Sequence, residues 1–568
     1  MIRAADRSIA LPSLSLALLT VGLTAAVDAQ DTRTVTQPTT PSSHCLMLNA
    51  NLPALSPTAF VPPRAFDDAT EASPPDTKRI NDAITQCSAV SAASNFVTPA
   101  VVELSAKGDN VSFLASLIVM RSGVTLLIDP GVTLYASRNA NEYDAGQGLC
   151  GTLQTSSSGC KNWITLSSSS SHPAKNIGFI GPGIIDGRGD AVITFTDGTG
   201  SEKNPNNYTW WELAHQADIQ GLSQVNPRMI QLSDVAGALI YNINLRNSPK
   251  FHIAAQRANQ VTIWGISVFS PEGQSRNSDA IDPNGTDWTI TQSYISVDDD
   301  DVAIKGGTVI NNGLTPSAQF MTIAKNHFYT GHGMSIGSET NAGVADIVVD
   351  DLTIDGADNG LRIKSDRSRG GIVQRVSYNN VCMRNIDRRN LGGGALLFSA
   401  YYTPNAVGTA YPDYRDVRVH NTHSLTPSHQ FFVGYDATHP LNIQLDNVIL
   451  ENQDPNLIVA SDAIVTLGPG PANFTPTGLD VTVFDDVTAP DEPPVDCSIR
   501  FVPFVAAGIP CDANGDGRID HDDLAAIGAA VGYSVYPGDP RDVDGDGVVT
   551  GHDVAMCATR CRHAACAP

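Results

Sequence analysis

The sequence predicts an all-β protein, a right-handed parallel β-helix, over most of its 568 residues. From Val101 onward the chain has short β-rich runs separated by Gly, Asn and Asp, and the central ones recur at intervals of roughly 20 to 35 residues, with insertions, which is typical of stacked solenoid coils. No long helical pattern alternates with these runs, so a βαβ fold is disfavoured. The clearest runs lie at residues 124–128, 177–180, 238–240, 261–263, 289–290, 321–323, 347–349, 417–419 and 443–445.

The first 29 residues are predicted to be a secretory signal peptide. Arg3 and Arg7 precede a mostly apolar run at residues 16–26, and small residues come before Gln30, as a signal-peptidase site requires. No later segment has about 18 or more uninterrupted apolar residues, so no membrane span is expected. We therefore expect a secreted protein that does not bind a membrane.

Composition and charge restrict the classes of partner. A hydrophobic content of 42% is ordinary for a soluble globular chain, and we expect a monomer. A formal net charge of −24 argues against nucleic acid as a partner.

Ten cysteines in an exported chain favour disulfides over metal thiolates. Cys150 and Cys160 bracket a short Gly- and Ser-rich loop and are the easiest pair to assign. The sequence leaves open the partners of the next group, which are Cys45, Cys87, Cys382, Cys497 and Cys511. Three more lie near the C-terminus (Cys557, Cys561 and Cys566), and an odd number there requires a partner elsewhere, for example Cys511.

The first regular element after the Pro- and Thr-rich entry is predicted to be one short helix at residues 76–87. Asp76 and Thr77 provide a helix start, and apolar residues then follow at helical spacing. We expect this helix to cap one end of the coil.

Residues 277–305 are the stretch around which the function is organised. Seven carboxylates flank or interrupt apolar strand residues there, although carboxylates repel one another and are rarely buried. If each run forms one rung of a coil, Asp279 lies within reach of Asp299 and Asp300. Such a cluster can keep one carboxyl protonated while others stay ionised, as glycoside hydrolysis requires. The alternatives from composition are a solvated face or a calcium site.

Two further blocks follow, residues 330–339 with His332 between two glycines, and residues 360–366. With the two aspartate runs, these blocks resemble glycoside hydrolase family 28, the polygalacturonases, which implies the same β-helix fold. The resemblance extends from residue 76 to about residue 504. It looks closest to bacterial endo-acting members at residues 181–187, 210–213, 227–231 and 247–253, and in the loop between Cys150 and Cys160.

The resemblance implies catalytic roles for four residues. Ala303-Ile304-Lys305 fixes the register of the family motif, so Asp299 matches the general acid. Asp279 and Asp300 match the pair that holds and deprotonates water, and His332 matches the histidine that keeps the acid protonated. Asp298 stands where the family has Gly, and we expect its charge to raise the pKa of the acid.

The resemblance also implies substrate-binding residues. Asn277 matches the family's Asn-Thr-Asp motif, with Ser at position 278. Arg362 and Lys364 lie two apart on a predicted strand and so share a face, where the family binds the galacturonate carboxylate. Simple solvent exposure is the alternative for this pair. Tyr402 is preferred over Tyr401 as the subsite tyrosine because of strand alternation. Catalysis by this family implies no cofactor.

Past residue 506 the pattern changes to two calcium-loop motifs with oxygen ligands at positions 1, 3, 5, 9 and 12 and Gly at position 6. The predicted ligands are Asp512, Asn514, Asp516, Asp520 and Asp523 in the first loop and Asp542, Asp544, Asp546, Thr550 and Asp553 in the second. The pair resembles the α-helical, EF-hand-like calcium module of type I dockerins, so structural Ca²⁺ is expected. His521-Asp522 and Gly551-His552 are not the small hydroxyl residues that often contact a cohesin. Two roles stay open, a stabilising cap and binding of a cohesin-like or cell-surface partner.

Together these observations predict a signal peptide at residues 1–29, a catalytic β-helix at 30–506 and a calcium-loop module at 507–568. The function implied is inverting, endo-acting hydrolysis of polygalacturonate or pectin. Basic residues near the motifs (Arg276, Lys305, Arg362 and Lys364) make such a substrate compatible with an acidic chain. The alternatives are an exo-acting or rhamnogalacturonan-hydrolysing member, or an inactive pectin-binding protein.

Overall fold

The structure is a computed structural model. It describes residues 31–42, 44–55, 66–195, 203–204, 206–308, 316–403, 405–487, 493–498, 500–504, 511, 513, 519, 521–532, 540–544 and 548–561. The predicted signal peptide lies outside the described residues.

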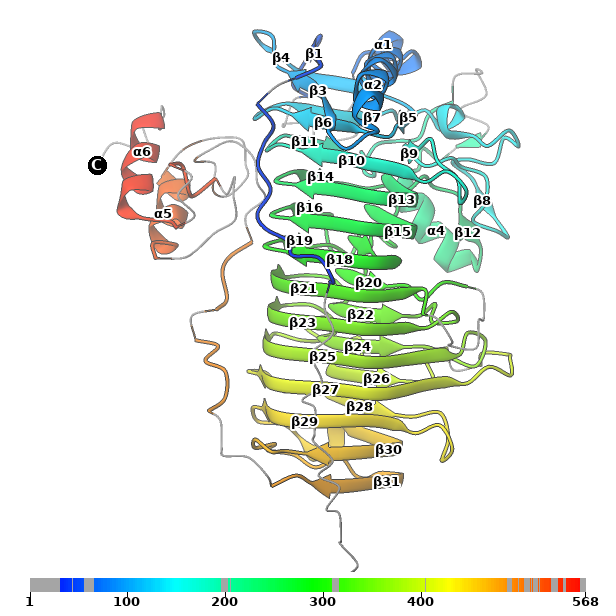
Figure 1. Cartoon of the computed structure of the whole chain (residues 1–568), viewed down its shortest axis with the longest axis vertical. Coiled ribbons are helices and arrows are strands. Elements are labelled where there is room, and N and C mark those ends of the chain that lie inside the picture. Colours follow the sequence, from blue (N-terminus) through cyan, green and yellow to red (C-terminus); the bar gives the residue numbers. More distant parts are fainter. Residues whose placement is uncertain are drawn as a thin grey trace, which may run out of the picture.

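Stacked strands form nearly all of the described chain (Figure 1). The strands are β1 (Leu46–Asn49), β2 (Leu52–Pro53), β3 (Ala100–Ser105), β4 (Asn110–Ala115), β5 (Ile118–Met120), β6 (Val124–Ile128), β7 (Thr133–Ala136), β8 (Leu153–Gln154), β9 (Ile164–Leu166), β10 (Ala174–Ile180), β11 (Ile184–Asp186), β12 (Ser223–Gln224), β13 (Ile230–Tyr241), β14 (Asn244–Arg246), β15 (Ile253–Trp264), β16 (Ser267–Phe269), β17 (Ile281–Asp282), β18 (Gly285–Thr291), β19 (Tyr294–Ser296), β20 (Val302–Ile304), β21 (Ala318–Phe328), β22 (Met334–Gly337), β23 (Val344–Asp355), β24 (Leu361–Lys364), β25 (Gly371–Arg384), β26 (Gly394–Ser399), β27 (Pro412–Ser424), β28 (His429–Val433), β29 (Leu441–Leu450), β30 (Ile458–Leu467) and β31 (Gly478–Asp485). The helices are α1 (Asp68–Ala72), α2 (Thr77–Ser91), α4 (Trp210–Gln220), α5 (His521–Ala529) and α6 (Gly551–Arg560), with 3₁₀ turns η1 (Ala92–Ser94), η2 (Ala140–Tyr143) and η3 (Pro455–Leu457).

Within the described residues, 29 strands belong to one hydrogen-bonded sheet, and its pairings are parallel except that of β2 with β4. Successive coils pair in register, as in Ile253 with Ile281 and Ile281 with Val302. This topology is consistent with a parallel β-helix, as the sequence predicts. β8 and β12 form a separate antiparallel pair.

Single residues with left-handed backbone turn the long strands around corners. In β13 and β15 the register passes over Asp234 and Arg257, whose φ angles are 54° and 52°. A residue in this conformation changes the chain direction without ending the hydrogen-bonded strand. Nε of Arg257 lies 2.7 Å from Oδ1 of Asp234, and Arg375 and Asp346 repeat the pair further along the coil. Rungs that look like two short strands in the sequence are therefore single bent strands.

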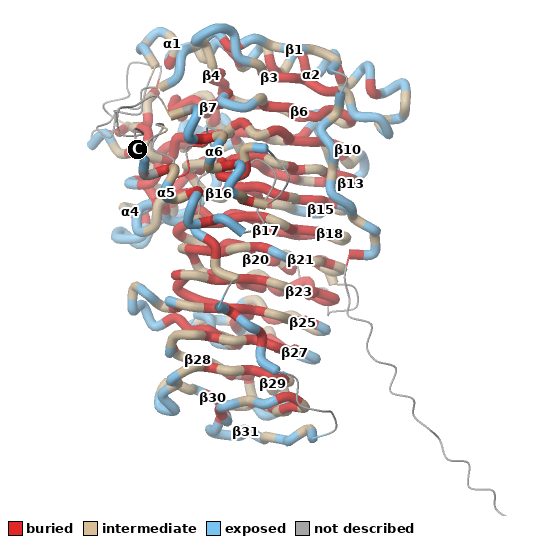
Figure 2. Tube along the Cα trace, turned by 90° about the vertical axis from the view of Figure 1, so that its left-hand side faces the viewer, coloured by how far each residue is buried: buried red, intermediate tan, exposed pale blue. Residues whose placement is uncertain are grey.

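The core is one continuous apolar column inside the coil, drawn as buried along the stacked strands in Figure 2. α2 closes its N-terminal end with buried Ile80, Ile84 and Cys87, and the Cys45–Cys87 disulfide ties the helix to the first rungs. The predicted cap at residues 76–87 is confirmed, and the helix continues to Ser91.

α4 is a helix that the sequence reading did not predict. Thr209 and Glu212 form a reciprocal capping box at its start, and Trp210 and Leu213 are buried. The signal was present in the sequence, because Thr-x-x-Glu before an apolar run marks a helix N-terminus. α4 lies beside β8 and β12 at the side of the coil (Figure 1).

An N-terminal strap, residues 31–42, crosses one face of the coil (Figure 1). The backbone N–H of Asp31 donates to Oγ1 of Thr322, and Arg33 donates to the carbonyl oxygen of Val261. The strap therefore spans several rungs of the β-helix.

The C-terminal segment packs along the coil before the chain reaches α5 and α6. Phe504 contacts the rings of Phe269 and Tyr329, and the Tyr329 hydroxyl donates to the carbonyl oxygen of Val502. Ile527, Val549 and Cys557 form a small separate core. Among the residues that the structure describes, no helix combines the length and apolar character needed to cross a membrane.

The disulfides settle pairings that the sequence left open. They join Cys45 to Cys87, Cys150 to Cys160, Cys382 to Cys497 and Cys511 to Cys557. The pair assigned from the loop is confirmed, and so is Cys511 as partner of a cysteine near the C-terminus.

Candidate active site

Turns on successive rungs bring the predicted catalytic residues together. Asp279 lies just before β17, Asp299 and Asp300 just before β20, and His332 just before β22. Because Ile281 pairs with Val302 and Val302 with Met334, these turns are stacked in register. The sequence prediction that the two aspartate runs form neighbouring rungs is confirmed.

Asp300 is the most firmly held carboxylate of the cluster. It accepts hydrogen bonds from Oγ of Ser335 at 2.7 Å and from Nζ of Lys364 at 2.6 Å, and Nη1 of Arg362 lies 3.6 Å from Oδ1. Burial raises the pKa of Asp300, but Lys364 and then Lys305 outweigh it and lower the pKa below its ordinary value. Asp300 is therefore an ionised carboxylate.

Lys305 lies at the centre of several acids. Its Nζ is 3.7 Å from Asp279, 3.6 Å from Asp282, 4.0 Å from Asp300 and 3.8 Å from Glu339. Burial lowers the pKa of Lys305, but these carboxylates, Asp282 foremost, raise it above its ordinary value. Lys305 is a permanent cation that offsets the charge of the cluster.

Asp279 and Asp282 hold their protons more tightly. Burial, and next the charge of Asp299, raises the pKa of Asp279 well above its ordinary value. Burial likewise raises the pKa of Asp282 to about 6. Oδ1 of Asp279 is buried and accepts no hydrogen bond from the described residues. The cluster thus contains acids of different strength, as acid and base catalysis require.

Asp282 was not among the predicted site residues. Strand alternation could have identified it, because the preceding Ile281 faces the core and Asp282 must then face outward beside Asp279.

Asp299 and His332 form a pair. Nδ1 of His332 lies 3.2 Å from Oδ1 of Asp299, and the His332 backbone N–H donates to the Asp299 carbonyl oxygen at 2.9 Å. Burial raises the pKa of Asp299, but the charge and hydrogen bond of His332, with Lys364, hold it below its ordinary value. These contacts favour the ionised form of Asp299, so the expectation that His332 keeps this carboxyl protonated is not met.

The prediction that the charge of Asp298 raises the pKa of Asp299 is wrong. Oδ1 of Asp298 accepts from the Gly273 backbone N–H at 2.7 Å and lies 3.0 Å from Nη1 of Arg389. These two contacts compensate the negative charge of Asp298. The pKa of Asp299 is lowered, not raised.

Asn277 is fixed beside the acid. Its φ is 55°, a left-handed conformation that Asn tolerates better than most residues, and its Nδ2 donates to Oδ2 of Asp299 at 3.4 Å. Nε2 of Gln224 donates to Oδ1 of Asn277 at 2.6 Å. The Asn277 amide is therefore oriented by β12.

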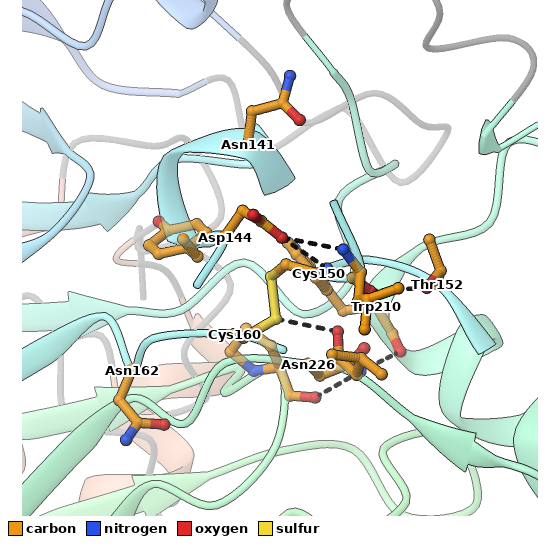
Figure 3. The surroundings of a disulfide bond; sticks show 12 residues. Asn141, Asp144, Cys150, Thr152, Cys160, Asn162, Trp210 and Asn226 are labelled. Carbon is orange, nitrogen blue, oxygen red and sulfur yellow. Dashed lines mark hydrogen bonds between the residues drawn. A yellow bond between two sulfur atoms is a disulfide. The ribbon is translucent and has the colours of Figure 1, made fainter. Parts of the chain in front are cut away.

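The loop closed by Cys150 and Cys160 supports this arrangement (Figure 3). The Asp144 carboxylate accepts the backbone N–H of Cys150, the first residue of the loop, and β8 within the loop pairs with β12. Asn226 on the far side of β12 donates to Gln224 at 2.9 Å. The disulfide-closed loop thus pairs with β12, and Gln224 of β12 orients the Asn277 amide.

Arg362 and Lys364 face outward from β24, as strand alternation predicts, because Leu361 and Ile363 are in the core. Nε and Nη1 of Arg362 are buried and donate no hydrogen bond to the described residues. Buried donors are almost always satisfied, so these two are available for an anionic ligand.

Tyr402 lies over these cations. Its ring centroid is 5.4 Å from Arg362, 5.3 Å from Lys364 and 5.9 Å from Arg369. Tyr401 instead stacks on Tyr435 at 5.6 Å. Both tyrosines follow the end of β26, so strand alternation does not decide between them, but the position of Tyr402 agrees with the preference for it.

The comparisons with known proteins decide the family. Residues 108–451 match the family described as Glycosyl hydrolases family 28. A polygalacturonase of Ralstonia nicotianae is 36% identical over 76% of this chain and 85% of its own length. The chain belongs to glycoside hydrolase family 28. This family 28 enzyme is therefore a glycosidase, as its motifs indicate.

Two further matches are an endo-polygalacturonase and a solved polygalacturonase structure. An endo-polygalacturonase of Pectobacterium carotovorum subsp. carotovorum is 36% identical over 77% of this family 28 chain and 94% of its own. The solved polygalacturonase of Erwinia carotovora ssp. carotovora superposes with a TM-score of 0.63 at 32% identity, over 77% of this chain and all of that one.

More cations lie on the rungs before the aspartates of this family 28 enzyme. Arg228 and Lys250 lie 5.0 and 5.7 Å from the ring centroid of Phe251. Burial, with Arg228 next, lowers the pKa of Lys250 to about 8. The predictions did not include these residues. Arg276 pairs with Asp218 of α4 at 2.8 Å, so its charge is partly offset there.

The predicted calcium ligands are only partly described. One carboxylate oxygen from each of Asp542, Asp544 and Asp553 lies within 4.8 Å of the other two, and the Asp553 carboxylate accepts the Thr550 backbone N–H at 2.8 Å. Asp523 is buried at the start of α5. The predicted ligands outside the described residues are Asp512, Asn514, Asp516, Asp520 and Asp546.

Proposed function

We propose that this family 28 enzyme hydrolyses α-1,4-galacturonosyl bonds within polygalacturonate, with inversion at the anomeric carbon. The observation that carries the proposal is the site around Asp300, where an ionised carboxylate and the Asp299–His332 pair adjoin the unused donors of Arg362. The polygalacturonase and endo-polygalacturonase relatives support the substrate.

In this proposal the Asp299 carboxyl gives a proton to the departing glycosidic oxygen. Because Asp299 is ionised at rest, it takes that proton from the imidazolium of His332 through the contact between Nδ1 and Oδ1 of Asp299. When the glycosidic oxygen is protonated, the sugar leaves as an alcohol instead of an alkoxide. This lowers the barrier to breaking the glycosidic bond.

Asp279 and Asp300 position the attacking water in this proposal. Asp279 accepts the proton in its ionised form, which the charge of Lys305 at 3.7 Å stabilises, whereas Lys364 and Ser335 restrict Asp300 to orienting the water. Attack by water on the face opposite the leaving group inverts the anomeric carbon.

The galacturonate carboxylate is bound by Arg362 and Lys364 in this proposal. Arg362 offers a charged guanidinium, and Tyr402 covers both cations and provides a ring against which a sugar can pack. A neutral sugar would leave the Arg362 donors unpaired, so the site favours a uronic acid.

Cations on both sides of the aspartates favour endo action. Arg228 and Lys250 lie on the rungs before Asp279, and Arg362 and Lys364 lie on a rung after Asp300. A polyanion can therefore extend in both directions from the cleaved bond. A product-length time course on polygalacturonate tests this: mixed oligomers should appear first, and release of monomer or dimer alone would contradict it.

We also propose export and a calcium-dependent C-terminal unit. Cleavage before Gln30 would be read by sequencing the N-terminus of the secreted protein. The oxygens of Asp542, Asp544 and Asp553 support one structural Ca²⁺ and the motif in residues 512–523 a second. A cohesin-like or cell-surface partner would be tested by binding to immobilised cohesin and to cells with and without Ca²⁺.

A further inference from the structure

His332 has a carboxylate at each of its ring nitrogens. Its Nδ1 lies 3.2 Å from Oδ1 of Asp299, and its Nε2 lies 3.5 Å from Oδ2 of Asp358. Asp358 is buried in the turn before β24, and its backbone N–H donates to the carbonyl oxygen of Gly331 at 2.8 Å. The turn that carries Asp358 is therefore fixed to the turn that carries His332.

Asp358 in turn binds Arg389. Nε of Arg389 donates to Oδ1 of Asp358 at 3.0 Å and Nη2 donates to Oδ2, while Nη1 donates to Oδ1 of Asp298 at 3.0 Å. Glu272 lies 3.4 Å from Nε of Arg389 and also pairs with Arg388. One guanidinium thus connects the carboxylate behind His332 to Asp298, the aspartate directly before the acid.

We propose that Asp358 is a positioning residue that keeps His332 doubly protonated, and that Arg389 limits this effect by neutralising part of the Asp358 charge. The inference rests on the proposed function, in which the Asp299–His332 pair delivers a proton. Nothing in the sequence motifs assigned a role to either residue.

The chemistry of imidazole carries the argument. A neutral imidazole has one N–H and one acceptor nitrogen, so it can donate to only one of two flanking carboxylates and leaves a lone pair facing the other. The imidazolium donates to both. With Asp358 in place, the charged form of His332 is favoured, and Asp358 also fixes the orientation of the ring towards Asp299.

Other charges near His332 act more weakly. Oδ2 of Asp301 accepts from the Gly333 backbone N–H at 2.9 Å, and burial raises the pKa of Asp301 well above its ordinary value, which favours its uncharged form. Lys364 lowers the pKa of Asp299 and of Asp300, on the Nδ1 side of the ring. The positive charge of Arg389 is bound to Asp358 and lies on the side of Asp358 away from His332.

The two residues make opposite predictions. Asp358→Asn removes a negative charge, so the pKa of His332 should fall by about one unit or more, and the alkaline limb of the kcat profile on polygalacturonate should move to lower pH by the same amount. Arg389→Gln leaves Asp358 uncompensated, so both should move to higher pH. Arg389→Lys keeps the charge and should stay close to the parent enzyme.

The measurement is the titration of His332 in the full chain by NMR of ¹³C-labelled histidine, with the signal assigned from its loss in His332→Gln. Unchanged titration in both Asp358→Asn and Arg389→Gln would overturn the inference, and so would shifts of the same sign. If Asp358→Asn does not fold, the Arg389→Gln and Arg389→Lys pair decides by the same criterion.

The same series separates this inference from the proposed function. A shifted His332 titration with an unmoved alkaline limb contradicts the positioning role and leaves polygalacturonate hydrolysis intact. A parent enzyme that releases no product from polygalacturonate contradicts the proposed function, whatever the titration of His332 shows.

Discussion

Nζ of Lys364 lies 2.6 Å from Oδ2 of Asp300. The residue predicted to bind the substrate carboxylate is thus also the main partner of a predicted catalytic carboxylate. A substrate carboxylate that approaches Lys364 must share it with Asp300, whereas Arg362 lies further from Asp300, at 3.6 Å, and makes no hydrogen bond to it. The two cations therefore contribute differently to binding and to chemistry.

This difference predicts distinct kinetics for the two variants. Arg362→Ala should raise KM on dilute polygalacturonate by more than tenfold, since a charge-assisted contact of about 2 kcal/mol is lost, with a smaller effect on kcat. Lys364→Met should lower kcat as well, because the pKa of Asp300 then rises and the carboxylate loses its orientation. Equal KM and kcat changes for both variants would contradict the division of roles.

Asp299→Asn should reduce kcat by about 10²- to 10⁴-fold and leave substrate binding nearly unchanged, because the amide keeps the shape but cannot donate the proton. Steady-state kinetics measures the loss of kcat, and equilibrium binding of substrate to the variant measures the affinity. Asp480→Asn is a matched control, since Asp480 is exposed on β31 with a left-handed φ that Asn tolerates. Near-normal turnover of Asp299→Asn would contradict the assignment of Asp299 as the proton donor.

Asp282 predicts a dependence of stability on pH. Its pKa in the folded protein is raised to about 6, so its contribution is greatest when the carboxyl is protonated and is lost as pH rises from its ordinary pKa to about 6. Asn cannot ionise. The free energy of unfolding of Asp282→Asn, relative to the parent, should therefore increase by about 2 kcal/mol between about pH 4 and about pH 7.

Denaturant unfolding at the two pH values measures this change, and Asp480→Asn again serves as the control. A constant difference between Asp282→Asn and the parent across the range would show that the folded protein does not raise the pKa of Asp282.

Calcium removal should loosen the C-terminal unit and leave hydrolysis largely intact. The carboxylates of Asp542, Asp544 and Asp553 repel one another without a cation, whereas the coil buries its own apolar core. Calorimetry on the full chain should show uptake of two ions, and Asp542→Asn with Asp553→Asn should abolish one. No calcium uptake by the parent would exclude the module.

A shortened chain tests the same boundary. Phe504 packs between Phe269 and Tyr329, so a chain that ends just after Phe504 should remain active, whereas one that ends before Val502 should be less stable. Thermal unfolding and turnover of the two chains would show the difference. Loss of hydrolysis in the longer one would mean that the C-terminal unit is part of the catalytic fold.

Features that depend on short-range pattern could be predicted from the sequence. Alternation along β24 placed Arg362 and Lys364 on one face, and the repeat of aspartate runs placed Asp279 beside Asp299. In a solenoid the residues of one rung contact mainly the next rung, so a spacing in the sequence becomes a distance in space.

Features that depend on irregular turns could not be predicted. Arg389 lies 91 residues from Asp298, in a turn whose path no periodicity specifies, and its ion pair reverses the expected effect of Asp298. Asp358 was missed for the same reason. The bent strands were read as shorter ones because Asp234 and Arg257 are ordinary polar residues until their φ angles are known.

The N-terminal strap has a consequence for the order of assembly. Asp31 binds Thr322, a partner 291 residues later in the chain, and Thr32 binds Asp287. Asp31 and Thr32 therefore lack these two partners until more than half of the chain has been synthesised. Contacts of such sequence separation form slowly, so the strap is made first and docks late.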